Sequence, residues 1–269
     1  RLQMTTIRAA YPRKHTFLTF YVPWSNLSGA YVPEIYEQYT NEYIELSKNK
    51  HQKLAEDFGS DYIFIDNLRY CKSLFQKYNI PMIGFNDIFN IKFMLFEEYF
   101  NRYDSISYID FDVVQKGTPT EEDQHKFLTA SCGIHYVDPM PGYLIHDNVT
   151  KLCNDFNIKP NRDIWQNNNG VITINKDTWL ELDYLRTVRE VYNKVEYAEQ
   201  VCDETMFNFA TMYNNVDVQH YDDKFNTLVR RREEFDCHER EEFRMFHFTK
   251  QTGKDVLNEE LRNPLSILY

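Results

Sequence analysis

Short apolar runs rich in β-branched and aromatic residues alternate with segments of helical apolar spacing through the first 110 residues of the chain. Three of these runs have the length and composition of buried strands, at residues 15–22, 61–66 and 105–110. Helices are predicted for the neighbouring segments, at residues 31–58, 68–78 and 88–99. Strands that alternate with helices in this way favour an α/β fold with a mainly parallel central sheet flanked by helices.

The second half of the chain continues with elements of the same kinds. Strands or extended segments are predicted at residues 170–175, 216–220 and 244–248. Helices are predicted at residues 177–193 and 203–213. No internal repeat, low-complexity tract or linker divides the chain, so we expect one domain over residues 1–269. Within it we expect a leader at residues 1–14, with Met4 as the native start, and a C-terminal tail from about residue 255 to residue 269.

The charge balance limits the partners of the chain. Lysine and arginine number 30 and aspartate and glutamate number 41, which gives a formal net charge of −11. Such an acidic chain is a poor match for nucleic-acid phosphates or anionic lipid, so we expect no nucleic-acid partner. The chain has only eight glycines and contains neither the G-x-G-x-x-G nor the G-x-x-x-x-G-K-[ST] phosphate-binding pattern. The acidic excess instead favours a site at which acidic residues bind a cation.

Cysteine usage and hydropathy suggest a compartment. The five cysteines are widely spaced and include no C-x-x-C pair, which disfavours a disulfide framework or a zinc site. No apolar run approaches the roughly 18 residues of a membrane span, so we expect no transmembrane segment. The N-terminus lacks the apolar core of a signal peptide. The sequence therefore predicts a soluble cytoplasmic protein.

Two carboxylates, Asp110 and Asp112, stand where the strand predicted at residues 105–110 ends. In an extended chain residues two apart point to the same side, so both carboxylates would face one side and Phe111 the other. Ligands of open α/β sheets bind beyond the carboxyl ends of the strands. A carboxylate pair at that edge can bind a divalent cation that also holds a diphosphate. The alternative is a solvated acidic turn that binds nothing.

Four segments resemble those of a known enzyme family, in the family's order. Residues 92–112 resemble its helix, strand and D-x-D region, and residues 166–175 resemble its f-N-[AS]-G-v segment. Residues 202–208 resemble its D-Q-x-x-x-N segment, and residues 246–254 resemble its terminal H-f-x-G-x-x-K. The family is that of the GT-A glycosyltransferases. The sequence is most similar to glycosyltransferase family 8, which includes glycogenin and bacterial lipopolysaccharide galactosyltransferases.

The resemblance implies a single GT-A domain, which is Rossmann-like, and a metal-dependent glycosyltransferase. Such an enzyme moves a sugar from a nucleotide-diphosphate donor, here expected to be a UDP-sugar, to a hydroxyl of a glycan or other acceptor, with retention. By the resemblance Asp110, Asp112 and His247 would hold Mn²⁺ or Mg²⁺, which neutralises the leaving diphosphate. Imidazole with carboxylates suits Mn²⁺ better than Ca²⁺. Strand alternation places His247 opposite its phenylalanine neighbours, although a core histidine is the alternative.

The resemblance also implies a set of donor-binding residues, namely Tyr21, Lys92, Asp110, Asn168, Asn169, Gly170, Lys250 and Lys254. Tyr21, at the end of the first strand, would stack on the nucleotide base. Lys92 would contact donor phosphate or sugar, and a solvated helix face is the alternative. The amides of Asn168 and Asn169 suit sugar hydroxyls, and Gly170 would let the backbone approach closely. A polar turn before a strand is the alternative for these three residues.

Two lysines near the C-terminus compete for one role in this scheme. Lys254 would be the diphosphate-binding lysine, but the spacing from His247 is one residue longer than in the family. Lys250 stands where the family has glycine, and either lysine could serve.

Asp203 and Glu204 are the candidate catalytic residues. They depart from the Asp-Gln of family 8 and resemble the Asp-Glu of another group of retaining galactosyltransferases, in which the glutamate lies beneath the anomeric carbon. Glu204 could then act as a nucleophile or stabilise an oxocarbenium-like transition state. Asp203 would bind a sugar hydroxyl. The alternative is a helix N-terminus that carries acidic residues because of the helix dipole.

Two other functions remain open from the residues alone. The stretch at residues 110–114 also matches the D-x-D-x-[TV] motif of haloacid-dehalogenase-type phosphatases, with Asp222 and Asp223 as a later metal pair. Against this, that motif normally ends the first strand of its fold, whereas at least two strands precede it here. The second alternative is a non-catalytic carbohydrate-binding protein on the same fold.

Overall fold

The computed structural model describes residues 14–22, 41–136, 145–237, 242–263 and 266. Most of the leader predicted for residues 1–14, and the part of the predicted helix before residue 41, lie outside these ranges. Residues 250–262 form a helix, which includes the first part of the segment expected as a C-terminal tail. None of the helices in the described part of the chain combines the length and apolar composition that a membrane crossing requires.

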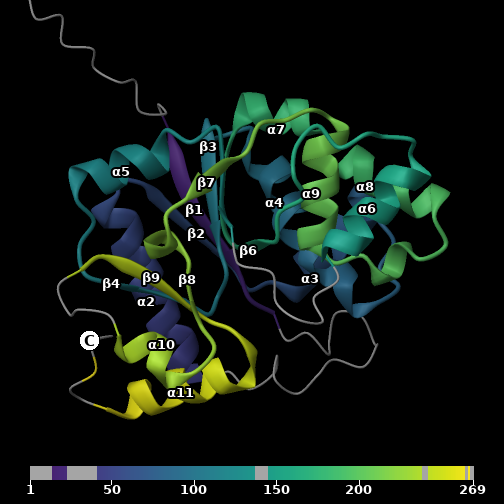
Figure 1. Cartoon of the computed structure of the whole chain (residues 1–269). Coiled ribbons are helices and arrows are strands. Elements are labelled where there is room, and N and C mark those ends of the chain that lie inside the picture. The colour runs from purple at the N-terminus through teal and green to yellow at the C-terminus, as the bar shows by residue number, and fades with distance from the viewer. Residues whose placement is uncertain (1–13, 23–40, 137–144, 238–241, 264–265, 267–269) are drawn as a thin grey trace, which may run out of the picture.

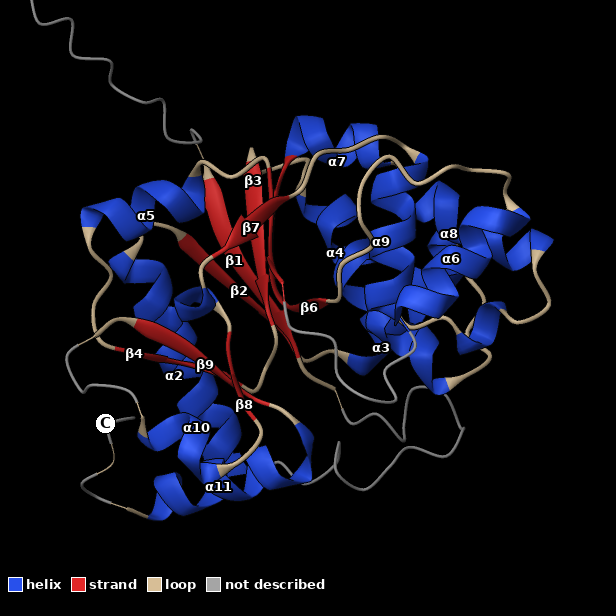
Figure 2. Ribbon diagram, in the orientation of Figure 1, coloured by secondary structure: helices blue, strands red, loops and turns tan. Residues whose placement is uncertain are grey.

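A six-stranded sheet forms the centre of the molecule (Figures 1 and 2). In spatial order its strands are β2 (Asp61–Ile65), β1 (His15–Phe20), β3 (Ser105–Ile109), β6 (Asn167–Asn175), β5 (Cys132–Tyr136) and β7 (Gln219–Tyr221). β1 pairs in parallel with β2 and β3, and β5 pairs in parallel with β7. β6 is antiparallel to both of its neighbours. The sheet is thus mainly parallel, as predicted, and its one reversed strand brings its amino end to the edge where β1 and β3 have their carboxyl ends.

A second, three-stranded sheet continues the chain beyond that edge. Its strands are β4 (Val113–Lys116), β9 (Arg244–Phe248) and β8 (Thr227–Val229), in that order. β4 and β9 are antiparallel, and Val113 lies opposite His247 in their register. Because β4 begins just after Asp112, this pairing brings a histidine from the end of the chain beside the acidic pair.

Helices cover both sides of the central sheet (Figure 1). One side carries α3 (Leu68–Tyr78), α4 (Ile91–Tyr99), α6 (Ile145–Asp155), α7 (Lys176–Leu182), α8 (Tyr184–Lys194) and α9 (Asp203–Tyr213). The other side carries the small sheet with α2 (Asn41–Asp57), α5 (Glu121–Leu128), α10 (Arg232–Asp236) and α11 (Lys250–Arg262). Short 3₁₀ turns complete the described chain as η2 (Phe85–Asn90), η3 (Ala198–Gln200) and η4 (Asp223–Phe225).

The core divides according to strand alternation. Leu18 and Phe20 of β1 pack into the cluster that α4 and α9 cover, together with the buried Phe93 of α4. Phe17 points to the other face and packs with Phe127 of α5. Successive residues of a strand face opposite sides, and every residue of β1 is buried, so the strand is covered on both faces.

Candidate functional site

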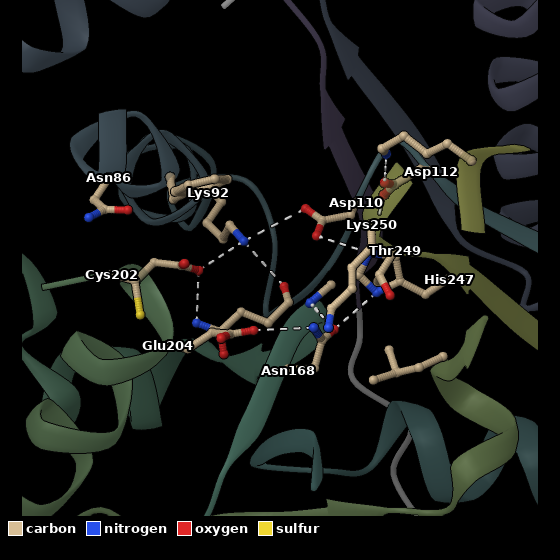
Figure 3. Close-up of a pocket in the computed structure, with 16 residues that line it drawn as sticks. Asn86, Lys92, Asp110, Asp112, Asn168, Cys202, Glu204, His247, Thr249 and Lys250 are labelled. Carbon is tan, nitrogen blue, oxygen red and sulfur yellow. Dashed lines mark hydrogen bonds and ion pairs between the residues drawn. The ribbon is translucent and has the colours of Figure 1, made fainter. Parts of the chain in front are cut away.

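A cavity of about 430 Å³ lies where the carboxyl end of β3, the amino end of β6 and the start of α9 meet the small sheet (Figure 3). Eleven of the twelve residues predicted from the sequence line it. They are Lys92, Asp110, Asp112, Asn168, Asn169, Gly170, Asp203, Glu204, His247, Lys250 and Lys254. Five residues that were not predicted complete the lining, namely Asn86, Phe89, Cys202, Leu228 and Thr249.

Tyr21 is the predicted residue that does not line this cavity. Its ring stacks on Phe111 at a centroid distance of 4.4 Å, and it is largely buried in a third apolar cluster. The backbone N–H of Tyr21 donates to Ile65 O at 2.9 Å, which extends the β1–β2 pairing by one residue. The pairing and the contact with Phe111 explain why the ring packs against the protein.

The acidic pair is positioned by a turn between the two sheets. Asp110 N donates to Gly170 O at 2.7 Å, and Val113 N donates back to Asp110 O at 3.0 Å. The carbonyl of Phe111 accepts hydrogen bonds from Tyr43 and Ser47 of α2, at 3.1 and 2.7 Å. The prediction of an extended chain through Asp112 is wrong, because the backbone turns at Phe111 to leave one sheet and enter the other.

Asp110, Asp112 and His247 form a compact group of potential metal ligands. One ligand atom from each lies within 4.8 Å of the others. His247 Nε2 is 3.7 Å from Asp110 Oδ2 and 3.2 Å from Asp112 Oδ1. Although burial opposes its ionisation, Asp112 has a pKa held below its usual range by the nearby Lys254 and His247. Two carboxylates and an imidazole that converge in this way fit a divalent cation.

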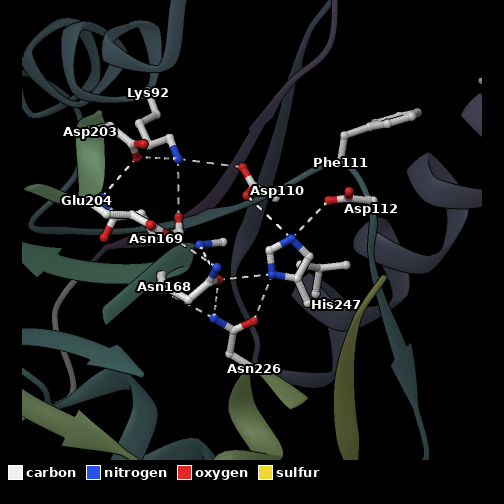
Figure 4. Close-up of polar contacts among 12 residues, drawn as sticks. Lys92, Asp110, Phe111, Asp112, Asn168, Asn169, Asp203, Glu204, Asn226 and His247 are labelled. Atoms are coloured by element: carbon white, nitrogen blue, oxygen red, sulfur yellow. Dashed lines mark hydrogen bonds and ion pairs between the residues drawn. The ribbon is translucent and has the colours of Figure 1, made fainter. Parts of the chain in front are cut away.

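The tautomer of His247 follows from its neighbours (Figure 4). Asn168 Oδ1 accepts from the backbone N–H of Gly170 at 3.0 Å, so the orientation of the Asn168 amide is defined. His247 Nδ1 lies 3.0 Å from that oxygen and 3.1 Å from Asn226 Oδ1. A ring nitrogen that faces two amide oxygens carries the hydrogen, so Nε2 is the nitrogen that could offer a lone pair to a cation held between the two carboxylates. This is the arrangement that a histidine ligand of a metal requires.

Asn226 and Gly170 complete the support of the ring. Asn226 is fully buried between η4 and β8, and its Nδ2 donates to Asn168 Oδ1 at 2.9 Å. Asn226 is not among the residues predicted from the sequence, because no pattern in residues 219–229 indicates a buried asparagine. At Gly170 an added Cβ would lie 2.3 Å from the His247 ring. Glycine is therefore needed at this position for the packing of β6 against His247.

Lys92 lies on the opposite wall of the cavity and is almost completely buried. Its Nζ is 3.0 Å from Asp203 Oδ2 and 3.7 Å from Asp110 Oδ1, and it donates to Asn169 O at 3.3 Å. Burial alone would lower the pKa of Lys92, but the charges of Asp110 and Asp203 outweigh it and raise the pKa above its ordinary value. Lys92 therefore remains a cation that links β3 to the start of α9.

The two candidate catalytic acids begin α9 (Figure 4). Asp203 accepts from Asn169 Nδ2 at 2.9 Å, and Glu204 accepts from Asn168 Nδ2 at 3.2 Å. Asn168 thus bridges Glu204 on one side and His247 on the other. Cys202, which caps the helix, has a pKa raised to about 12 by burial and by the neighbouring acids, so its thiol is not an activated nucleophile.

The two C-terminal lysines occupy different surroundings. Lys254 is buried, and its Nζ lies 2.6 Å from Asp112 Oδ2. Gly253 permits this, because a Cβ there would lie 2.2 Å from Val229 O. Lys250 is exposed and lines the cavity at the start of α11.

The acidic pair expected for a phosphatase lies elsewhere. Asp222 pairs with Lys126 at 2.6 Å, and Asp223 pairs with Arg244 at 2.8 Å. Among the described residues neither belongs to the group of ligands around Asp110.

No protein-family model matches the chain, and no curated protein matches it. Solved structures of glycosyltransferases do. The galactosyltransferase LgtC, in complex with donor and acceptor sugar analogues, is 12% identical with a TM-score of 0.50, over 79% of this chain and 75% of that one. Mouse xyloside xylosyltransferase 1 is 15% identical with a TM-score of 0.48, over 89% and 99%. A glycosyltransferase involved in glycosylation of the major capsid of PBCV-1 is 11% identical with a TM-score of 0.49, over 93% and 98%. The likeness to LgtC confirms the predicted GT-A fold.

Proposed function

We propose that this chain is a metal-dependent, retaining glycosyltransferase that moves a sugar from a UDP-sugar to a hydroxyl acceptor such as a glycan. The observation that carries the proposal is the convergence of Asp110, Asp112 and His247 Nε2 in one cavity with Asp203 and Glu204. The LgtC structure, which has the same fold, contains donor and acceptor sugar analogues. The fold can therefore bind both substrates of a sugar transfer.

Asp110, Asp112 and His247 would hold Mn²⁺ or Mg²⁺. The bound cation would neutralise the charge that develops on the diphosphate when the sugar leaves it. His247 is prepared for this role because its other nitrogen already donates to the amide oxygens of Asn168 and Asn226. Both carboxylates come from the turn between the sheets, so their positions depend on both sheets.

The opposite wall would bind and orient the sugar. Asn168 and Asn169 present amides, which can both donate to and accept from hydroxyls. Lys92 holds Asp203 in place and supplies positive charge near the donor. Glu204 lies at the same end of α9, where a carboxylate could act as a nucleophile or stabilise positive charge at the anomeric carbon.

The experiment that tests the proposal combines binding with turnover. A thermal-shift screen of nucleotide sugars with Mn²⁺ should identify a donor that raises Tm, because a ligand of the native state stabilises it. Transfer from that donor should fall at least about a hundredfold in Asp112→Asn. The substitution also removes the ion pair with the buried Lys254, so Tm should fall, and activity is compared at a temperature at which both proteins are folded. The control is Asp223→Asn, an acid outside the cavity, which should retain activity. Full activity in Asp112→Asn would refute the proposal.

The same assays separate the alternatives. Metal-dependent binding of UDP without any turnover would support a carbohydrate-binding protein. Release of phosphate from para-nitrophenyl phosphate that depends on Asp110 would support a phosphatase. NMR of the anomeric proton of the product decides between retention and inversion.

A further inference from the structure

Five residues other than glycine have a left-handed backbone conformation in the described part of the chain. Four of them are asparagine or aspartate, whose short polar side chains tolerate this conformation, namely Asn79, Asn157, Asp183 and Asn215. The fifth is Lys250, with a φ of 59°. A long side chain gains nothing locally from this conformation, and its Cβ is crowded by the backbone. The backbone at Lys250 is therefore strained, and strain of this kind persists where the surrounding structure imposes it.

The surroundings of Lys250 show what imposes it. Phe248 N donates to Asp112 O at 3.1 Å, and Thr249 N donates to Val229 O at 3.0 Å, so the end of β9 is held on both sides. α11 begins at once, and Gly253 packs in its first turn against Val229 O. The chain has to reverse at Lys250 to connect these two constraints. A glycine there would make the same turn without strain.

The side chain of Lys250 has a role that glycine could not supply. The cavity is lined by four carboxylates and three lysines. Two of the lysines form ion pairs with these carboxylates, Lys92 with Asp203 and Asp110, and Lys254 with Asp112. Lys250 makes no ion pair with any residue that the structure describes. It lies on the same side of the cavity as His247 and Asp112, across from Lys92 and Cys202 (Figure 3).

We infer that Lys250 is the cation that binds the diphosphate of the donor, and that Lys254 positions Asp112. The strained backbone at Lys250 is retained because it places a positive charge in the cavity beside the metal ligands. This inference rests on the proposed function, since it requires a nucleotide diphosphate in the cavity. Lysine at position 250 would therefore raise the affinity for the diphosphate and lower the stability of the fold.

Three variants of Lys250 separate charge from backbone strain. Lys250→Gly removes both, Lys250→Met removes the charge and keeps the strain, and Lys250→Arg keeps both. Affinity for UDP in the presence of Mn²⁺ should fall about tenfold in the glycine and methionine variants and remain close to wild type in the arginine variant. Affinity for uridine, which has no phosphate, should be the same in all three. Lys72→Met removes an exposed lysine from α3 and controls for net charge.

Stability should follow a different order. Lys250→Gly should raise Tm by about 2 °C, because it relieves the strain, whereas Lys250→Met should not. A glycine variant that binds UDP as tightly as the wild type would overturn the inference and leave the proposed function standing. A glycine variant with a lowered Tm would overturn the argument from strain. If the wild type binds neither UDP nor inorganic pyrophosphate, the proposed function fails, and this inference fails with it.

Discussion

Two buried histidines lie at opposite ends of the parallel strands, and both are held through both ring nitrogens. His15, at the start of β1, contacts Ser60 Oγ at 2.7 Å and Ser107 Oγ at 2.8 Å. His247, beyond the carboxyl end of β3, contacts amide oxygens through Nδ1 and carboxylates through Nε2. The partners of His15 are neutral hydroxyls within the packed core, whereas those of His247 include anions that line a cavity. Burial and hydrogen bonding are therefore common to a structural histidine and a candidate functional one. What distinguishes His247 is that it faces carboxylates and lines a cavity.

The largest effect is expected when each histidine is removed in turn. His247→Ala should lower metal-dependent transfer by about three orders of magnitude, because it removes a proposed ligand of the cation, and it should also lower Tm, because the buried ring is hydrogen-bonded. His15→Ala should leave Mn²⁺ binding unchanged and destabilise the fold by about 2–4 kcal/mol, because the hydroxyls of Ser60 and Ser107 lose their partner. Activity assays and denaturant titrations of both variants check this. An inactive but fully stable His15→Ala would contradict the comparison.

Acid should destabilise the fold through two buried histidines, His15 and His51. Burial lowers the pKa of His15 to about 3 and that of His51 to about 4, from an ordinary value of 6.5. At pH values below 6.5 and above about 4, these two histidines bind more protons in the unfolded chain than in the folded chain. The free energy of unfolding should therefore decrease as the pH falls from 6.5 to about 4, by up to about 1.4 kcal/mol per pH unit for each histidine.

Denaturant titrations at a series of pH values measure this dependence. His51→Gln should show a shallower slope, since one of the two buried bases is gone. A free energy of unfolding that does not change across this window would show that His15 and His51 are accessible to protons in the folded state.

A smaller effect is expected at Asn226, which would act on the proposed metal site through its contact with His247. Asn226→Ala removes an acceptor of His247 Nδ1–H, and affinity for Mn²⁺ should fall about tenfold to a hundredfold. Asn226→Asp keeps the acceptor oxygen and should retain more of the affinity. Asn90 is a matched control, because it is buried and accepts from Tyr184 at 3.0 Å away from the metal ligands. Asn90→Ala should lower Tm without changing Mn²⁺ affinity.

Titration of Mn²⁺ by electron paramagnetic resonance, without any nucleotide, measures these affinities. The ¹⁵N shifts of the His247 ring in the metal-free protein give a second measurement, since Asn226→Ala removes a hydrogen-bond acceptor of Nδ1–H and should shift the Nδ1 resonance. Unchanged ring shifts together with unchanged affinity would exclude a positioning role for Asn226.

The elements predicted with the observed bounds are those in which the spacing of apolar residues starts and stops where the element does. Residues 68–78 and 203–213 form α3 and α9 with the predicted bounds, and residues 244–248 form β9. The helix predicted at residues 177–193 is two helices, because Asp183 takes a left-handed conformation with φ of 41° between α7 and α8. A helical spacing that continues across such a turn does not reveal it.

Three short or polar elements, β4, β8 and α5, were not predicted from the sequence. β4 and β8 have three or four residues, too few for a periodic pattern. α5 carries a capping box formed by Thr120 and Asp123, which would have predicted its start. The reversed direction of β6 depends on which strands it pairs with, and no local pattern contains that information.

The residues of the candidate site could be predicted from the sequence for a different reason. Asp110, Asp112 and His247 belong to segments whose order resembles a known family, so their convergence could be expected before the structure. Asn226 belongs to no such segment, and its importance comes only from two contacts across the fold, with Asn168 and His247. The strain at Lys250 was not expected either, although its position in place of a family glycine was visible in the sequence.

The acidic turn joins two sheets, and this has a mechanical consequence. Asp110 follows a strand of the large sheet, whereas His247 belongs to a strand of the small one. A cation bound by Asp110 and His247 would cross-link the two sheets. Amide protons of β8 and β9 should then exchange with solvent more slowly when Mn²⁺ is added, while those of β1 and β2 should not respond. The proposed metal site would in this way make the stability of the small sheet depend on the presence of the cation.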